Sequence, residues 1–538
     1  MKTTIISIIC VLTIASASKA WEVPEIIGVL YPVLPDTEAF GSDFICVGDQ
    51  NGDGCDELML THENRSWYGG DRHYANQVKI YYGGEEVDNE PGFVFSIDED
   101  DDSTGIGRHI NYIGNLTPEI KNCIALCSYI YHDDHDGYED IVKIKIYNGG
   151  EDLDNEPEFT ITTERENAIY LGQQNYQSRP VDLNGDGYHD LIAGQRFGDG
   201  SKLLAFWGGE EFDTIPDWEV YSSGNRGGRP DISPGFDVNG DGYDDVLFKT
   251  REDDNDWWYS IYLGGSPMDT TPVVRFMQDH FEHAMMTYGF SMLQDVNDDG
   301  YDDWVIHFNR INSRIDGYYL FFGSEEPDME PDIVLEGNHL NYSYEGAVSG
   351  GDFNGDGKGD IVTTAWYGFL HDGEIHIHFG GETLCTEPDI IVNCASAYGE
   401  EYENLGFRVG AVGDYNGDGA DDFATRFYER HRLVVFAGNR DWCSVDDEKK
   451  IPGVYELYLD VSPNPFNSSV KIVYELSRKS HASITVFDVR GRKQTQLVNG
   501  IIDKGCHLLS WSNQTAGIYF IVLKTDNIQK VKKIVCLP

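Results

Sequence analysis

The sequence has few basic residues, and this shortage limits the partners that the protein can bind. Lys and Arg together number 39 against 93 Asp and Glu, so the 538-residue chain has a formal net charge of −54 at pH 7. Such a field repels the phosphates of nucleic acids and anionic lipid surfaces. The sequence therefore argues against nucleic acid as a partner. It also predicts strong self-repulsion in the folded protein unless bound cations neutralise part of the charge.

Long apolar segments and paired cysteine motifs are also scarce. Residues 1–20 are typical of a secretory signal peptide, with Lys2 ahead of an apolar run and small residues up to Ala20. No later segment has about 20 consecutive apolar residues, so no transmembrane segment is expected. The cysteines after the signal lack the CxxC spacing of zinc modules, and Cys385 with Cys394 is the favoured pair if a disulfide forms.

A repeated loop motif dominates the rest of the chain. The string Asp-x-Asn-(Gly/Asp)-Asp-Gly, with an acidic ninth residue, begins at Asp49, Asp182, Asp237, Asp295, Asp352 and Asp414. Each copy precedes a short apolar strand and a second strand that ends in an aromatic-Gly sequence, and all copies except the one at Asp414 precede a third element of alternating apolar residues after a proline. Short strands, Gly-rich turns and the lack of helical periodicity indicate an all-β array.

The spacing of the motif predicts seven units. The interval from Asp49 to Asp182 is about twice the others, and the register of the closing glycines places Asn115 at the start of a hidden unit whose loop motif has decayed. The near-match at 132–140 then belongs to a loop between two strands, and whether it binds a cation of its own stays open. Seven units of this length predict a seven-bladed β-propeller over residues 21–445.

The two ends of the array complement one another. Units one to six each end in a Pro-x-apolar strand, but the seventh unit has no such strand before the polar segment that follows it. A segment of the missing type lies at the other end of the chain, in Val23–Leu30. We therefore expect Val23–Leu30 to complete the last blade, which would close the ring and remove the open sheet edges.

The loop motif has the composition of a calcium site. Calcium binds several oxygen ligands at short range, and acidic or amide side chains at alternate positions of a tight loop can turn toward one centre. An EF-hand would need an acidic ligand at position twelve, where all six copies have an apolar residue or Thr. Without a cation, carboxylates ~5 Å apart at an effective dielectric of ~20 repel by roughly 3 kcal/mol per pair.

The predicted ligands occupy positions one, three, five, seven and nine, where position seven contributes its backbone carbonyl, and six Ca²⁺ ions are expected. They are Asp49, Asn51, Asp53, Cys55, Glu57, Asp182, Asn184, Asp186, Tyr188, Asp190, Asp237, Asn239, Asp241, Tyr243, Asp245, Asp295, Asn297, Asp299, Tyr301, Asp303, Asp352, Asn354, Asp356, Lys358, Asp360, Asp414, Asn416, Asp418, Ala420 and Asp422.

These repeats resemble the FG-GAP repeats of the integrin α-subunit propeller and of many bacterial exported proteins. The Phe-Gly element is present at Phe40-Gly41 and in reversed order at Gly289-Phe290 and Gly406-Phe407. The resemblance covers residues 21–445. It implies calcium on the loops of one face, where the ions rigidify the blades and take no part in catalysis.

The charge changes sign near residue 450, which indicates a domain boundary. Residues 451–538 have a net charge of +5, whereas the first 450 residues have −59. We expect a linker at 446–454. The alternation of polar and apolar residues after it predicts a small immunoglobulin-like β-sandwich at 455–538.

Four short motifs in this tail resemble the C-terminal sorting domain of the type IX secretion system. They are Ser462–Asn467, Phe487–Arg492, Gly517–Tyr519 and Lys532–Val535. The resemblance implies Sec-dependent export, recognition by the secretion machinery, and passage across a Gram-negative outer membrane to the cell surface or the medium. Whether the domain is then removed stays open.

The sequence leaves three classes of function open. The favoured class is a non-catalytic, calcium-stabilised binding propeller for adhesion or for capture of an extracellular glycan or protein, with Trp67, Tyr68, Trp257 and Trp258 as candidate contacts. The second is a polysaccharide lyase or hydrolase on a propeller scaffold, and the third is a structural surface component. No catalytic residue is assigned. The histidines that could ligate a metal are His132, His135, His280, His283, His371, His376 and His378.

Overall fold

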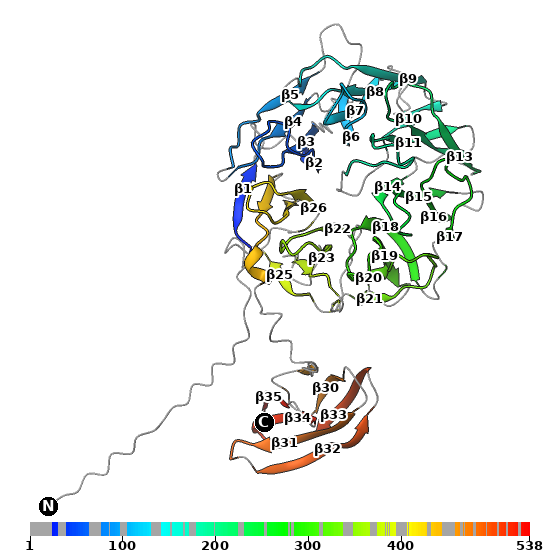
Figure 1. Cartoon of the computed structure of the whole chain (residues 1–538). Helices are drawn as coiled ribbons and strands as arrows, with labels where there is room; N and C mark the ends of the chain where they lie inside the picture. The colour runs from blue at the N-terminus through cyan, green and yellow to red at the C-terminus, as the bar shows by residue number, and fades with distance from the viewer. Residues whose placement is uncertain are drawn as a thin grey trace, which may run out of the picture. The chain divides into compact units, whose positions relative to one another are not determined.

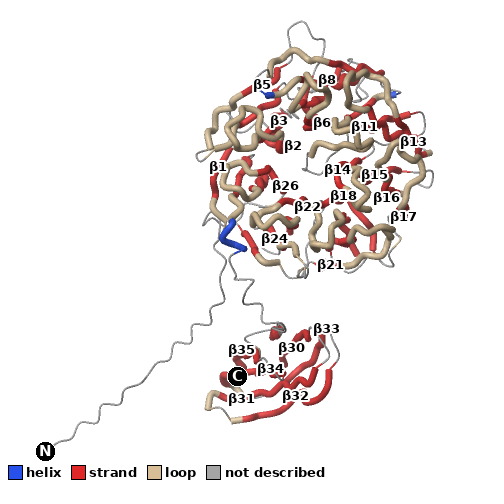
Figure 2. The backbone as a smooth tube through the Cα atoms, in the orientation of Figure 1, coloured by secondary structure: helices blue, strands red, loops and turns tan. Residues whose placement is uncertain are grey.

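The computed structural model contains two compact units, which divide between Cys443 and Ser444. Nearly all regular structure is β-strand, and helix is limited to short turns such as η3, Arg440–Cys443 (Figure 2). The structure describes residues 24–30, 39–63, 77–84, 87–96, 105–130, 141–150, 153–164, 167–171, 179–197, 200–223, 231–251, 256–277, 280, 284–310, 316–336, 348–365, 374–381, 384, 386, 388–393, 406, 408–427, 432–443, 458–462, 466, 469–476, 480–490, 492–502, 505–512, 515–525 and 529–537.

Several features expected from the sequence lie outside the described residues. They are the signal peptide, the linker 446–454, the near-match 132–140, and the cysteines Cys385 and Cys394. The described residues contain no helix that is long and apolar enough to cross a membrane.

Seven four-stranded antiparallel sheets make up the described part of the first unit. We call them blades one to seven, in the chain order of their inner strands, which are β2, β6, β10, β14, β18, β22 and β26. Figure 1 shows them side by side around a ring, with first strands such as β2, β14 and β22 toward its middle. In blades one to six the strands are paired in chain order, so each blade is a simple meander. The expectation of an all-β chain built from four-stranded units is confirmed.

The first three blades have the following strands. Blade one contains β2 (Ala39–Cys46), β3 (Leu58–Glu63), β4 (Gln77–Tyr81) and β5 (Phe93–Ser96). Blade two contains β6 (Gly105–Gly114), β7 (Cys123–Ile130), β8 (Ile141–Tyr147) and β9 (Phe159–Glu164). Blade three contains β10 (Ile169–Tyr170), β11 (Leu191–Phe197), β12 (Gly200–Phe206) and β13 (Trp218–Ser222).

The next three blades repeat this plan. Blade four contains β14 (Asp231–Phe236), β15 (Asp245–Arg251), β16 (Trp257–Tyr262) and β17 (Val274–Met277). Blade five contains β18 (Ala284–Leu293), β19 (Asp303–Arg310), β20 (Asp316–Phe321) and β21 (Ile333–Glu336). Blade six contains β22 (Val348–Gly351), β23 (Asp360–Ala365), β24 (Glu374–His378) and β25 (Ile390–Asn393).

Blade seven is assembled from both ends of the unit. Its strands are β26 (Arg408–Gly413), β27 (Asp422–Phe427), β28 (Arg432–Phe436) and, on the outer edge, β1 (Ile26–Leu30). β1 pairs antiparallel with β28, with Val29 opposite Val434 and Leu30 opposite Leu433. The inner strand β26 also contacts β2 of blade one. The N-terminal strand therefore covers the edge that β28 would otherwise expose.

Apolar side chains fill the spaces between neighbouring blades. One buried cluster joins Phe40 and Leu60 of blade one to Val435 of blade seven, and another joins Ile144 of blade two to Leu204 of blade three. Since each blade is covered on both faces, the central strands carry apolar residues on both sides, as in β12 and β28. Burial of these faces holds the blades together.

The second unit is a sandwich of two sheets. One sheet has β29 (Tyr458–Ser462), β30 (Ser469–Leu476) and β33 (Gly505–Ser512). The other has β31 (Ser480–Asp488), β32 (Lys493–Ile502), β34 (Gly517–Thr525) and β35 (Gln529–Cys536). A core that includes Ile472, Ile484 and Ile521 lies between them. Phe466 and Tyr519 each contact the Trp511 ring edge to face, so the expected sandwich has a defined aromatic centre.

We expect deletion of residues 1–31 to destabilise the first unit, because β28 then loses its edge partner. The variant should melt at a lower temperature than a control that lacks only residues 1–23 and keeps β1. It should also associate as its concentration rises, as measured by light scattering. Equal melting temperatures for the two variants would contradict a role of β1 in closing blade seven.

Candidate cation-binding loops

The repeated motif forms the turn between the first and second strands of a blade. The stretch from Asp182 to Asp190, for example, lies between β10 and β11, and the stretch from Asp237 to Asp245 lies between β14 and β15. Backbone hydrogen bonds join successive loops, except that the Asn122 side chain joins the loop of blade two to that of blade one, so the loops form a continuous belt around the first unit.

The first Asp of each loop closes the turn by accepting backbone hydrogen bonds. The Oδ1 atom of Asp182 accepts from the backbone N–H of Gly185 at 2.7 Å, and its Oδ2 atom accepts from that of Gly187 at 2.8 Å. The bond from the sixth residue to the first Asp recurs in all six loops, at 2.7 to 2.9 Å. Gly187 has a φ of 88°, a conformation that favours glycine, which explains the invariant Gly at position six of the repeat.

Positions three, five and seven form a second set of contacts within the same turn. Asn184 Nδ2 donates to Asp186 Oδ2 at 3.2 Å, and the Tyr188 backbone N–H donates to Asp186 Oδ1 at 2.9 Å. The Asn-to-Asp contact has lengths of 2.8 to 3.3 Å across the six loops. The oxygen atoms of positions one, three and five are therefore gathered on one short stretch of chain.

The ninth residue is buried and connects its loop to the end of the third strand. Asp190 accepts from the backbone N–H of Leu183 at 2.8 Å through Oδ2 and from that of Gly208 at 2.9 Å through Oδ1. Asp245 and Asp303 make the same pair of bonds at 2.8 Å. The ninth acid thus binds backbone amides with both oxygens, a structural role that the sequence pattern did not reveal.

This arrangement explains the Gly in the aromatic-Gly signature. A Cβ atom placed on Gly208 would lie 2.3 Å from the backbone oxygen of His189. A side chain at this position would therefore push the third strand away from the loop and break the bond to Asp190.

Burial makes ionisation of the ninth carboxyl unfavourable. Burial and, to a smaller extent, the charges of the first and fifth acids raise the pKa of Asp190, Asp245 and Asp303 to about 8 each, although backbone hydrogen bonds oppose the shift. Burial has the same effect on Asp422, whose pKa is raised to about 8, and on Glu57, whose pKa is raised to about 7. Each loop therefore holds carboxylates that a cation would help to keep ionised.

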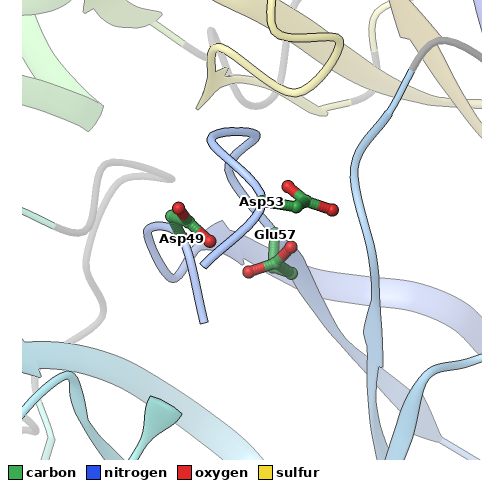
Figure 3. Close-up of side chains that lie close together, drawn as sticks. All are labelled: Asp49, Asp53 and Glu57. Atoms are coloured by element: carbon green, nitrogen blue, oxygen red, sulfur yellow. The ribbon is translucent and has the colours of Figure 1, made fainter. Parts of the chain in front are cut away.

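The donor set fits a hard cation. Oxygen atoms of Asp49, Asp53 and Glu57 all lie within 4.8 Å of one another, and Figure 3 shows the three side chains on one loop. The Glu57 Oε1 and Asp360 Oδ2 atoms are buried, and the backbone N–H groups of Gly83 and Phe353 are the donors beside these carboxyls. A divalent cation bound by oxygen ligands would supply the counter-charge that these buried carboxylates need.

The loop of blade two has neutral residues at positions one, three and nine, and its one acid, Glu119, is exposed. Asn115 Oδ1 accepts from the Asn122 backbone N–H at 3.3 Å, and Thr117 Oγ1 accepts from that of Ile120 at 3.0 Å. These bonds replace the carboxylate contacts of the other loops. The loop that the sequence identifies as decayed is thus closed by neutral groups.

The other candidate ligands do not gather into a second site. His376 Nε2 lies 3.0 Å from Glu374 Oε2, His378 is buried, and the His280 ring packs 5.9 Å from that of Phe276. Among the described residues, the cluster of metal-ligating side chains is the one at Asp49. The remaining candidates, which are His132, His135, His283, His371, Trp67 and Tyr68, lie outside the described residues.

Two of the aromatic candidates stack against cations of their own blade. Lys249 Nζ lies 4.6 Å from the ring centre of Trp257, and the guanidinium of Arg275 lies 4.5 Å from that of Trp258. A more exposed aromatic pair lies on blade three, at the end remote from its loop.

Phe197, at the end of β11, and Tyr221, on β13, are 42% and 55% exposed, and their rings meet edge to face at 6.1 Å. Lys202 Nζ lies 4.3 Å from the Phe197 ring and 2.8 Å from a carboxylate oxygen of Glu219. Sequence reasoning did not single out this pair, because neither residue belongs to a motif.

Comparisons with known proteins support both parts of this architecture. The sequence model of the FG-GAP repeat matches residues 346–378, and that of the secretion system C-terminal sorting domain matches residues 460–537. Integrin alpha-IIb from Mus musculus is 24% identical over 220 residues, which are 36% of this chain and 21% of the integrin. The chain therefore spans about a fifth of the length of this relative.

Solved structures show only distant likeness. An active polycomb repressive complex 2 in the basal state aligns with a TM-score of 0.36 at 10% identity, over 67% of this chain and 71% of that one. A fructofuranosidase from Schwanniomyces occidentalis aligns with a TM-score of 0.26 at 9% identity, over 80% and 81%.

These findings define the class of protein. The chain combines FG-GAP repeat sequence in an all-β first unit with a C-terminal sorting domain in the second. The sorting domain is the part read by the secretion machinery, and it directs the protein to the cell surface or the extracellular space.

The raised pKa values predict how stability depends on pH when divalent cations have been removed by dialysis. A carboxyl whose folded-state pKa lies above its unfolded value stabilises the fold at pH values below both, and this stability is lost as the pH rises through the folded pKa. With values of about 8 at Asp190, Asp245, Asp303 and Asp422, the melting temperature should fall between pH 5 and pH 8. Calorimetry across this range tests the trend, and a rising melting temperature would contradict it.

Proposed function

We propose that the protein is a secreted, calcium-stabilised binding propeller without catalytic activity, displayed on the outer surface of a Gram-negative-type bacterium or released into the medium. The observation that carries the proposal is the repetition of one oxygen-rich, hydrogen-bonded loop in six blades. Calcium would be held by the side chains at positions one, three, five and nine and by the carbonyl at position seven. Its charge would keep the buried carboxylates ionised.

The same contacts support a stabilising function for the loops. In the loop that begins at Asp182, the first acid and the ninth acid, Asp190, each have both carboxylate oxygens bound to backbone N–H groups. Neither acid is therefore placed for proton transfer to a substrate. A cation there would reinforce the turn and the loop-to-strand bond. Repetition of the loop in six blades also favours a structural function, because a catalytic centre would need only one such site.

The exposed pair Phe197 and Tyr221 supports an extracellular glycan as the ligand. Aromatic rings stack on the apolar faces of sugars, and the nearby Lys202 and Glu219 offer a donor and an acceptor for hydroxyl groups. The charge of −59 on the first 450 residues disfavours acidic polysaccharides, so a neutral glycan suits this surface.

Chelation should lower the melting temperature of the first unit, because calcium binds only the folded loops. At a calcium concentration a hundredfold above Kd, each occupied site adds about 2.7 kcal/mol to the free energy of unfolding. Calorimetry with calcium and with EDTA, both at pH 7, measures the difference. An identical melt in the two buffers would remove calcium from the proposal.

Simultaneous substitution of Phe197→Ala and Tyr221→Ala should weaken binding to neutral glycans. The measurement is retention on a broad glycan array, with released sugar assayed in the same wells. Ile391→Ala provides a matched control, because Ile391 is 48% exposed on another blade. Retention unchanged by the double substitution would exclude this surface, and released sugar would replace the binding function with an enzymatic one.

A further inference from the structure

Neighbouring loops of the belt are joined through the residue at position eight. The backbone N–H of Asp244 donates to the carbonyl of Asp182 in the preceding loop at 3.1 Å, and that of Asp302 donates to the carbonyl of Asp237 at 3.0 Å. Asp421 does the same to Asp352, and Asp56 does it to Asp414. The residue that receives each bond is the first Asp of the preceding loop, which is the first proposed ligand.

The side chain at position eight completes a reciprocal pair. The backbone N–H of Asp182 donates to Asp244 Oδ2 at 2.8 Å, and that of Asp237 donates to Asp302 Oδ2 at 3.0 Å. The bonds from Asp352 to Asp421 and from Asp414 to Asp56 have lengths of 2.8 and 3.0 Å. In four blades, therefore, the peptide groups on both sides of the first ligand are bound by a residue of the next blade.

The exceptions follow the same logic. At Gly359 no side chain is available, and the Asp295 N–H instead donates to Asp302 Oδ1 of its own loop at 2.9 Å. The Asn115 loop also differs, since the Asn115 N–H donates to His189 Nδ1 at 2.7 Å. Beside the Asp49 loop the eighth residue of the next blade is Asn122, whose Nδ2 donates to the Asp49 carbonyl at 3.4 Å. A carboxylate from the next blade is thus found beside four of the six loops that begin with Asp.

Positions four and seven provide a second contact between loops. The Tyr243 ring packs over Gly185 of the preceding loop so closely that a Cβ atom there would lie 2.5 Å from the ring. Where the fourth residue is Asp298 instead of Gly, the seventh residue of the next loop is Lys358, and their charged groups lie 3.1 Å apart. The contact is kept with different chemistry, so each loop shapes the next.

We propose that the eighth residue of a loop, where it is Asp, is a positioning residue for the cation site of the preceding blade, so that the sites of these two neighbouring blades are energetically coupled. It binds the backbone of the first ligand and does not itself ligate the ion. The inference rests on the proposed binding of calcium. A cation that orders the first Asp also favours the reciprocal pair, and by linkage the pair favours the cation.

Asp244→Ala in the full chain tests this inference. Hydrogen exchange read by mass spectrometry reports calcium-induced protection for each loop separately, and calcium is titrated as the only probe. In Asp244→Ala the half-saturating calcium concentration of the 182–190 loop should rise about tenfold, because a charge-assisted hydrogen bond is lost. The remote 414–422 loop should keep its wild-type midpoint.

Asp244→Asn is the matched control, since its amide oxygen can still accept from Asp182 and should restore a midpoint close to that of the wild type. If Asp244→Ala fails to fold, Asp421→Ala tests the same relation on the 352–360 loop. An unchanged midpoint of the preceding loop, or an equal shift in all loops, would overturn the positioning role while leaving calcium binding intact. Absence of calcium-induced protection in the wild-type protein would reject the calcium proposal itself, and this inference with it.

Discussion

The burial of a carboxyl group at the ninth position of each loop is the constraint on which the first unit depends. This group joins three parts of a blade: the loop, the start of the second strand and the end of the third strand. Burial makes its ionised form unfavourable, and the acids at positions one and five add to the effect. The group is therefore both the anchor of the blade and the reason that the blade needs a counter-charge.

The acidic residues of the repeated loops explain part of the net charge of −54. Part of the acidic excess lies in the repeated loops, one of which holds oxygen atoms of Asp49, Asp53 and Glu57 within 4.8 Å of one another. Blade two shows the alternative, a loop closed by Asn and Thr side chains, whose single acid, Glu119, is exposed. The carboxylates of the acidic loops repel one another. The proposed calcium ions, available in the extracellular space, would neutralise this repulsion and be held by the same carboxylates.

The ring adds a second level of organisation to the blades. Apolar clusters between blades supply the bulk of the contact, while β1 covers the edge of β28 and joins the two ends of the unit. The hydrogen bonds between loops are more directional, since each runs from a first Asp to the eighth residue of the next blade. Such bonds fix the orientation of one blade against the next in a way that apolar packing alone does not.

The sequence by itself determined the all-β class, the loop residues and the sorting domain, because each of these rests on local periodicity or on a short motif. The ligand candidates of one loop lie within nine residues, and at the Asp49 loop the turn brings Asp49, Asp53 and Glu57 together. Only the tertiary structure decided what the eighth residue does, since Asp244 and Asp302 bind groups 62 and 65 residues away. The same holds for Gly208, whose need for glycine comes from the approach of His189, and for Phe197 and Tyr221, which β12 brings together from separate strands. Contacts of this kind depend on how separate strands and blades pack, and no single stretch of the chain records them.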